Sequence, residues 1–106
     1  MTLLGELYAQ KAGMRLFPGT LNLELDEAWQ VPKQRAIRIE KEEYGGRVSV
    51  SLVPCRVFGR SAFILRTDQN DDGTGRHGLT IVEIATDVKL RDTYALVDGS
   101  MVEVEL

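Results

Sequence analysis

The sequence predicts a mainly β fold: a small six-stranded β-barrel with one N-terminal helix. Helical periodicity of the apolar residues is confined to the first dozen positions, and from residue 21 onward the period falls to 2. Glycine-containing turn signals then separate short alternating runs at close intervals. Several short strands of this kind behind a single helix are typical of a closed or nearly closed barrel.

The helix is expected over residues 2–12. Apolar side chains recur there at the spacing of one helical face, and charged and amide side chains take the remaining positions. Thr2 can cap the first turn, because its hydroxyl can accept a hydrogen bond from a free backbone N–H. Gly13 is the expected end, since glycine readily takes the left-handed conformation that closes helices.

The strands follow from alternation of apolar and polar residues. Residues 21–25 (LNLEL), 37–40 (IRIE) and 48–52 (VSVSL) alternate without interruption. Gly45 and Gly46 predict a type I′ hairpin turn between the last two runs, because both central positions of that turn need a positive φ. Further strands are expected at 55–58 and 61–65, joined by a turn at Gly59-Arg60, and at 79–84 and 102–106, the last following a turn at Asp98-Gly99.

Two stretches do not have a strand pattern. Residues 89–94 are compatible with one helical turn, and residues 67–78 form a polar loop of unusual length. Residues 68–73 (DQNDDG) match the first half of an EF-hand loop, but Leu79 stands where the bidentate glutamate belongs, so we expect weak Ca²⁺ binding at best and favour a solvated acidic loop. His77 is interpreted as a surface residue of this loop.

Length and charge limit the function classes. A chain of 106 residues suffices for one domain, here residues 1–106, and its net charge of −3 without a basic cluster disfavours nucleic acid as a partner. The sequence contains no apolar run near the ~20 residues that cross a bilayer and no signal-peptide pattern, so we expect a cytoplasmic protein with no membrane contact. Cys55, the only cysteine, stands in an apolar context that favours a buried structural thiol.

Residues 17–22 (FPGTLN) are the most informative segment for a site. Thr20 and Asn22 are two residues apart, so their side chains should leave the same face of the strand that follows the turn. A hydroxyl and an amide oxygen side by side suit Mg²⁺, whose other ligands would be waters and phosphate oxygens. The competing interpretation, which the spacing alone favours, is that both side chains only satisfy hydrogen bonds of the turn.

Two further groups could bind a ligand. Lys89 and Arg91 stand two apart at the start of the expected helical turn and could hold phosphate, although a solvated turn is favoured when this motif is considered alone. Glu83 interrupts an apolar run at residues 81–84, so its partner matters; alternatively it is an outward-facing strand residue.

Taken together, these segments resemble the CTP-dependent riboflavin kinases. The resemblance rests on the order of residues 13–14 (GM), 17–23 (FPGTLNL), His77, 81–84 (IVEI), 89–92 (KLRD) and 97–99 (VDG), and it runs from about Leu7 to the end. The family is best known from archaea and has the fold of a small cradle-loop β-barrel, in agreement with the alternation described above.

The resemblance implies a reaction that transfers the γ-phosphoryl group of CTP to the ribityl 5′-hydroxyl of riboflavin, which gives FMN and CDP. No residue of the sequence stands out as the general base, and phosphoryl transfer depends mainly on positioning and charge neutralisation. The implied roles are Mg²⁺ binding by Thr20 and Asn22, nucleotide binding by Lys89, Leu90, Arg91 and Asp92, and flavin binding by Glu83 and Thr74, the threonine being displaced by one residue from the family's pattern.

One departure from the family opens alternatives. The family begins with a strand and a glycine-rich loop that cradles CTP, whereas this chain begins at the helix. Without that strand we expect an open sheet edge, which could pair with a second copy in a homodimer. The alternative to a kinase is therefore a barrel that binds flavin or nucleotide without turnover, and a third interpretation is a β module that binds protein or DNA.

Overall fold

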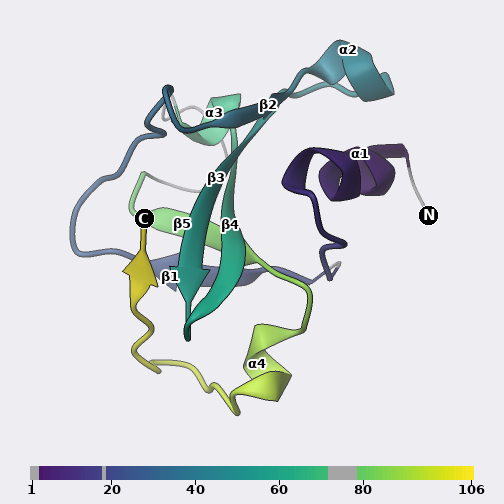
Figure 1. Cartoon of the computed structure of the whole chain (residues 1–106). Coiled ribbons are helices and arrows are strands. Elements are labelled where there is room, and N and C mark those ends of the chain that lie inside the picture. The colour runs from purple at the N-terminus through teal and green to yellow at the C-terminus, as the bar shows by residue number, and fades with distance from the viewer. Residues whose placement is uncertain (1–2, 18, 72–78) are drawn as a thin grey trace.

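The architecture was obtained as a computed structural model, which describes residues 3–17, 19–71 and 79–106 (Figure 1). Strands dominate, and the helices other than the first are single turns. In chain order the elements are α1 (Leu3–Ala12), β1 (Leu21–Glu24), β2 (Ile37–Ile39), α2 (Lys41–Tyr44), β3 (Val50–Val57), β4 (Arg60–Thr67), α3 (Asp68–Asp71), β5 (Ile81–Ala85), α4 (Leu90–Thr93) and β6 (Val104–Glu105).

The six strands form one antiparallel sheet that curls into a half-barrel, which confirms the mainly β, barrel-like prediction. The strand order is β1-β5-β4-β3-β2, and β6 pairs with the far end of β3. The long hairpin of β3 and β4 is the centre of the sheet, because its eight residue pairs run from Val50↔Thr67 to Val57↔Arg60. Figure 1 shows this hairpin between β2 and β5, with α2 and α4 at opposite ends of the molecule.

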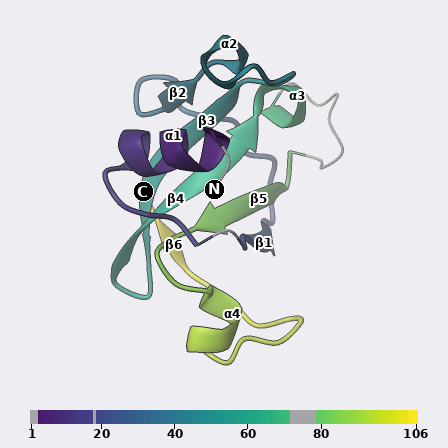
Figure 2. The same ribbon diagram turned by 90° about the vertical axis from the view of Figure 1, so that its right-hand side faces the viewer.

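Alternation along the strands divides the apolar residues between two cores. One face of the sheet carries a cluster that includes Leu21, Val53, Ile64 and Ile84, with Leu23 and Leu25 packed against it. The other face carries Ile39, Leu52, Phe63, Leu65 and Ala85, and the apolar side of α1 covers it. Figure 2 shows α1 lying across this face. The leucines of β1 therefore point to the core, as their spacing predicts.

The N-terminal helix and its end agree with the sequence. Gly13 adopts φ +74°, and its N–H donates to the carbonyl of Ala9 at 3.1 Å, so the left-handed residue ends α1.

Among the described residues no helix is long and apolar enough to cross a membrane. The single cysteine is also placed as predicted: Cys55 lies in the core of β3, where burial raises the pKa of its thiol to about 11.

The type I′ turn predicted at Gly45-Gly46 is wrong. The chain instead forms the helical turn α2, in which the backbone N–H of Glu40 donates to the Glu43 carboxylate at 2.7 Å. Only Gly45 is left-handed, at φ +68°, and its N–H donates to the carbonyl of Lys41. β2 and β3 are still antiparallel neighbours, so the pairing is correct and only the connection differs.

The second hairpin turn lies one residue earlier than predicted. Phe58 and Gly59 occupy the two central positions, with φ +52° and +75°, and Val57 pairs with Arg60 on either side of them. A phenylalanine is costly at positive φ, and here its ring stacks on Tyr94 with centroids 4.0 Å apart. A contact distant in sequence thus decides the position of the turn.

The described start of the polar stretch after β4 is structured and not a solvated loop. Residues 68–71 form the helical turn α3. Asp68 is ion-paired with Arg38, and the Asp71 carboxylate accepts the backbone N–H of Val31 at 2.8 Å. Gly73, Thr74 and His77 lie outside the described residues. The expected helical turn near residues 89–94 is confirmed as α4.

Candidate functional site

A hollow of about 200 Å³ lies where the start of β1 approaches α4. Its lining comes from two segments about 70 positions apart in the sequence, both of which the sequence singled out. The lining residues are Gly19, Thr20, Leu21, Asn22, Lys89, Leu90 and Arg91.

Thr20 and Asn22 lie beside Glu83 on one face of the sheet. Asn22 is directly opposite Glu83 in the antiparallel pairing of β1 with β5. The Thr20 hydroxyl donates to Glu83 Oε1 at 3.3 Å. Directly paired residues of an antiparallel ladder present their side chains on the same face, so three oxygen-bearing side chains gather at this point.

The same face also carries Tyr8 of α1 in this neighbourhood. Burial raises the pKa of the Tyr8 hydroxyl, and the nearby Tyr44 and Glu83 raise it further. Tyr8 therefore stays a neutral hydrogen-bonding group at physiological pH, at the boundary between the α1 core and the polar cluster.

The donor set fits a hard divalent cation that keeps waters and phosphate ligands. Thr20 and Asn22 are exposed and supply two neutral oxygens, and Glu83 adds one carboxylate next to them. Within the described part of the chain, no three His, Cys, Asp or Glu side chains gather into a closed metal cage. Such an open set suits Mg²⁺, which retains part of its hydration and takes other ligands from phosphates.

The two cations of the 89–92 segment are held only by weak surface pairs. Lys89 Nζ lies 3.6 Å from Asp92, and Arg91 Nη2 lies 3.1 Å from Asp98. All four side chains are at least half exposed, and exposed pairs contribute only about 0–1 kcal/mol. A phosphate entering the hollow could therefore take over Lys89 and Arg91 at little cost.

Leu90 attaches this segment to the fold. Its side chain is 3% exposed and packs in the core with Leu21, although the residue also borders the hollow. A second link joins the two walls, because the backbone N–H of Phe17 donates to the carbonyl of Thr86 at 2.7 Å. The metal-binding candidates and the cationic turn are thus held in one place by both side-chain packing and the main chain.

The structure brings together most of the residues singled out in the sequence. Thr20, Asn22, Lys89, Leu90 and Arg91 line the hollow. Glu83 is joined to it through Thr20, and Asp92 through Lys89, but neither lines it. Thr74 lies outside the described residues, so its expected flavin contact stays a prediction.

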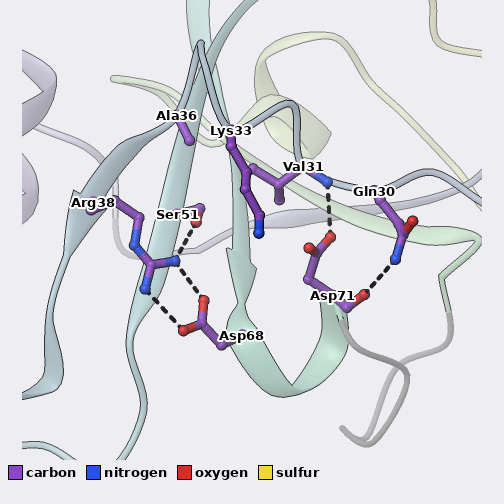
Figure 3. A pocket seen from close by; sticks show the side chains of 8 residues that line it. All are labelled: Gln30, Val31, Lys33, Ala36, Arg38, Ser51, Asp68 and Asp71. Atoms are coloured by element: carbon purple, nitrogen blue, oxygen red, sulfur yellow. Dashed lines mark hydrogen bonds and ion pairs between the residues drawn. The ribbon is translucent and has the colours of Figure 1, made fainter.

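A larger groove of about 760 Å³ was not predicted from the sequence (Figure 3). It lies between the segment before β2 and the helical turn α3. Its lining residues are Gln30, Val31, Lys33, Ala36, Arg38, Ser51, Asp68 and Asp71.

An ion pair occupies one side of this groove. The Arg38 guanidinium donates to the two carboxylate oxygens of Asp68 at 2.6 and 2.9 Å, and to the Ser51 hydroxyl at 2.9 Å. These bonds hold the pKa of Asp68 below its ordinary range. Figure 3 shows Arg38, Asp68 and Asp71 bonded to neighbours, and the Lys33 side chain extending into the groove.

In the groove, Arg38 and Asp68 hydrogen-bond to each other and Asp71 accepts the N–H of Val31. In the smaller hollow, Lys89 and Arg91 each have one exposed ion-pair partner. The members of the groove could not be grouped from the sequence, because Arg38 and Asp68 are 30 positions apart and meet only through the β2–β3–β4 pairing. Arg66 does not line the groove, but it could have been singled out from the sequence. It is a charged residue that directly follows the apolar run of residues 62–65 within one strand.

Comparison with known proteins gives one family for this chain. The model of the CTP-dependent riboflavin kinase family (CTP-dep_RFKase), described as a domain of unknown function, DUF120, matches residues 3–106. That match covers nearly the whole chain, including both walls of the hollow.

Several curated relatives are named riboflavin kinases. The chain is 32% identical over 104 residues to a riboflavin kinase of Methanocella arvoryzae, covering 93% of this chain and 45% of the relative. It is 31% identical over 108 residues to a riboflavin kinase of Thermofilum pendens, covering 93% and 47%. A riboflavin kinase of Archaeoglobus fulgidus is 31% identical over 106 residues, with 93% and 43% covered. The chain spans about half the length of these relatives.

Proposed function

This chain belongs to the family of CTP-dependent riboflavin kinase domains, and on that ground we propose that it transfers the γ-phosphoryl group of CTP to the 5′-hydroxyl of riboflavin. The products are FMN and CDP. The observation that carries the proposal is the hollow in which an oxygen pair, Thr20 and Asn22, faces a cationic turn with Lys89 and Arg91. Phosphoryl transfer requires a metal site next to cationic side chains that bind phosphate.

The proposed mechanism assigns positioning and charge neutralisation to the protein. Thr20 and Asn22 would hold Mg²⁺, which when bound neutralises phosphate charge and polarises the phosphoryl oxygens. Lys89 and Arg91 exchange their surface partners for phosphate oxygens of CTP, the guanidinium through two parallel hydrogen bonds. Asp92 stays beside Lys89 and limits its movement.

Glu83 is proposed to contact the flavin substrate, together with Thr74. A carboxylate accepts hydrogen bonds from a ribityl hydroxyl or a ring N–H, and Glu83 lies one strand away from the metal candidates. In the structure its Oε1 already accepts a hydrogen bond from the Thr20 hydroxyl. A riboflavin hydroxyl would take the place of the Thr20 hydroxyl at Glu83 Oε1.

The partners in this proposal are small molecules, with no nucleic acid and no membrane, and a cytoplasmic location is proposed with them.

A homodimer through a sheet edge is a further proposal. Among the described strands β1 pairs only with β5, so its other side could accept a strand from a second copy. Sedimentation at increasing protein concentration tests the dimer, and a constant monomer mass would contradict it.

The testing experiment is chromatographic detection of FMN. The purified chain is incubated with riboflavin and Mg²⁺ plus CTP, with ATP in place of CTP, or with CTP and excess EDTA. The proposal expects FMN with CTP and Mg²⁺, little with ATP and none with EDTA.

The negative outcomes separate the alternatives. A folded chain that makes no FMN but quenches riboflavin fluorescence on titration would be a binding barrel without turnover. A folded chain that neither makes FMN nor quenches flavin fluorescence would contradict the proposed function altogether.

A further inference from the structure

One side chain from the central hairpin holds both ends of the segment that carries Lys89 and Arg91. Arg60, at the start of β4, donates from Nη1 to Asp87 Oδ1 at 2.7 Å. Its Nε donates to the Tyr94 hydroxyl at 3.1 Å, and its guanidinium lies 5.7 Å from the centroid of the Tyr94 ring. Asp87 precedes α4 and Tyr94 ends it.

The hairpin reinforces both attachments. Before α4, the buried hydroxyl of Thr86 donates to the carbonyl of Ser61 at 2.7 Å. After α4, the Tyr94 ring stacks on Phe58 at an interplanar angle of 16°. The segment from 86 to 94 is therefore an arch whose two ends rest on the β3–β4 turn.

The arch needs this support because α4 has no stability of its own. It contains four residues, and isolated helices shorter than about 12 residues are marginal in water. Ala95 follows in the left-handed region at φ +52°, which is unfavourable for a residue other than glycine. Leu90 fixes the middle of the arch in the core, but one buried side chain does not fix the rotation of the turn about itself.

We propose that Arg60 is a positioning residue for nucleotide binding. By fixing both ends of the arch it keeps Lys89 and Arg91 directed at the hollow that they share with Thr20 and Asn22. Arg60 does not line that hollow, so it acts through the arch. The inference rests on the proposed function for the identity of the ligand. The attachment of the arch by Arg60 can be measured without any ligand.

The role requires arginine and not merely a cation. A guanidinium presents donors in a rigid fork, so Arg60 can reach a carboxylate with one nitrogen and a phenol with another. A lysine has one ammonium group and can keep the Asp87 pair while losing the Tyr94 bond. We therefore expect Arg60→Lys to rescue only part of the function that Arg60→Met loses.

The control comes from the same hairpin. Arg56 lies on β3, and its Nη2 donates to the carbonyl of Gly59 at 2.7 Å, with no bond to α4 recorded among the described residues. Arg56→Met removes an equal charge and one hydrogen bond within the turn itself, and should leave the Asp87 and Tyr94 contacts of the arch in place. Tyr94→Phe is a second variant that keeps the stack on Phe58 and removes only the hydroxyl.

Two measurements are made on each variant in the full chain. Amide hydrogen exchange is followed at Thr93, Tyr94 and Leu96, whose N–H groups donate to the carbonyls of Lys89, Leu90 and Arg91. CTP affinity by calorimetry and the KM values for CTP and riboflavin are measured in parallel. Arg60→Met should speed exchange at these amides and weaken CTP binding by about tenfold, with the KM for riboflavin unchanged.

The outcomes decide between the proposals. Unchanged exchange in Arg60→Met would overturn the positioning role, whether or not the chain is a kinase. Faster exchange with unaltered CTP affinity would make Arg60 merely structural and would also overturn it. A wild-type chain that binds no CTP would overturn the proposed function instead, and the exchange data would still report whether Arg60 holds the arch.

Discussion

Arg66 shows how much a single residue can contribute to this fold. It is 2% exposed, and its guanidinium donates to the main-chain carbonyls of Leu79 at 3.3 Å and Ile81 at 2.7 Å, and also to that of Trp29. Asp71 lies beside it at 3.5 Å. A charge is buried at β4 because the carbonyls of Trp29, Leu79 and Ile81 converge on it, that of Leu79 also accepting the backbone N–H of Trp29.

Replacement of Arg66 should therefore be costly. Arg66→Met keeps an unbranched side chain but removes every hydrogen bond from the guanidinium to these main-chain carbonyls, so we expect a loss of about 3 kcal/mol in the free energy of unfolding. Arg66→Lys should recover only part, since three donors on one nitrogen cannot reach carbonyls on different sides. Urea denaturation measures both, and a loss below about 0.5 kcal/mol for Arg66→Met would contradict the assigned role.

Thr20 and Asn22 should matter for turnover and not for folding. Both are exposed, so the double variant Thr20→Ala/Asn22→Ala should melt near the wild-type temperature. Its rate of FMN formation should fall by about 100-fold or more if the pair holds the metal. Glu24→Ala, two residues further on the same strand face, is the matched control. Normal turnover in the double variant would contradict the metal assignment.

At the scale of elements, left-handed residues determine where helices and strands end. Gly45 closes α2 at φ +68°, and an added Cβ there would meet no atom within 4 Å, so only the backbone conformation opposes substitution. Gly45→Ala should thus lower stability by about 1 kcal/mol, and Gly45→Asn by less, because asparagine tolerates this region. Thermal denaturation of both variants tests the order, and equal losses would contradict the conformational explanation.

The strands were predictable and the connections only partly so. Alternation in residues 21–25 and 48–52 is a local property, and it placed β1 and its inward-facing leucines correctly. The runs 48–52 and 55–58, expected as two strands, instead belong to the single strand β3 (Val50–Val57). The turn at Phe58-Gly59 depends on a ring 36 positions away, and the α2 turn depends on a carboxylate bond from Glu43 that competes with a hairpin. Local sequence does not contain the contact of Phe58 with Tyr94, whereas the bond between Glu43 and Glu40 is local and was overlooked in favour of the glycine pair.

The candidate site divides in the same way. Thr20, Asn22 and the 89–92 segment were found because their residue types suit metal and phosphate, and because a known family carries them in that order. Arg60 was not found, since it gains its role from Asp87 and Tyr94, which are 27 and 34 positions distant. The pairing of β4 with β5, in which Phe63 is opposite Ala85, is what brings the segment after β5 close to Arg60.

At the scale of the whole molecule, ion pairs join separate elements. Arg38 of β2 binds Asp68 of α3 and also Glu40, and Lys11 of α1 lies 3.3 Å from Glu43 of α2. Hydrogen bonds from Arg38 hold the pKa values of Asp68 and Glu40 below their ordinary range. The backbone N–H of Glu40, followed by Lys11, does the same for the pKa of Glu43.

These shifts predict how stability depends on pH. A carboxyl whose pKa is lower in the folded state stabilises the fold above its unfolded pKa of about 4, and that stabilisation is lost as the pH falls through the folded value. The urea midpoint should therefore fall between pH 6 and pH 3. In Arg38→Met the fall should be shallower, because Asp68 and Glu40 lose their main partner. Parallel pH profiles of wild type and variant would contradict this.

The contact between Arg66 and Trp29 has a practical consequence. The guanidinium lies 5.0 Å from the centroid of the indole ring, and Trp29 is the only tryptophan in the chain. The same guanidinium bonds to Asp71 and to the carbonyl of Leu79. A displacement of either residue would therefore move the cation that lies beside the indole. The molecule thus contains its own optical reporter, whose emission will change whenever a ligand or an unfolding event shifts Arg66.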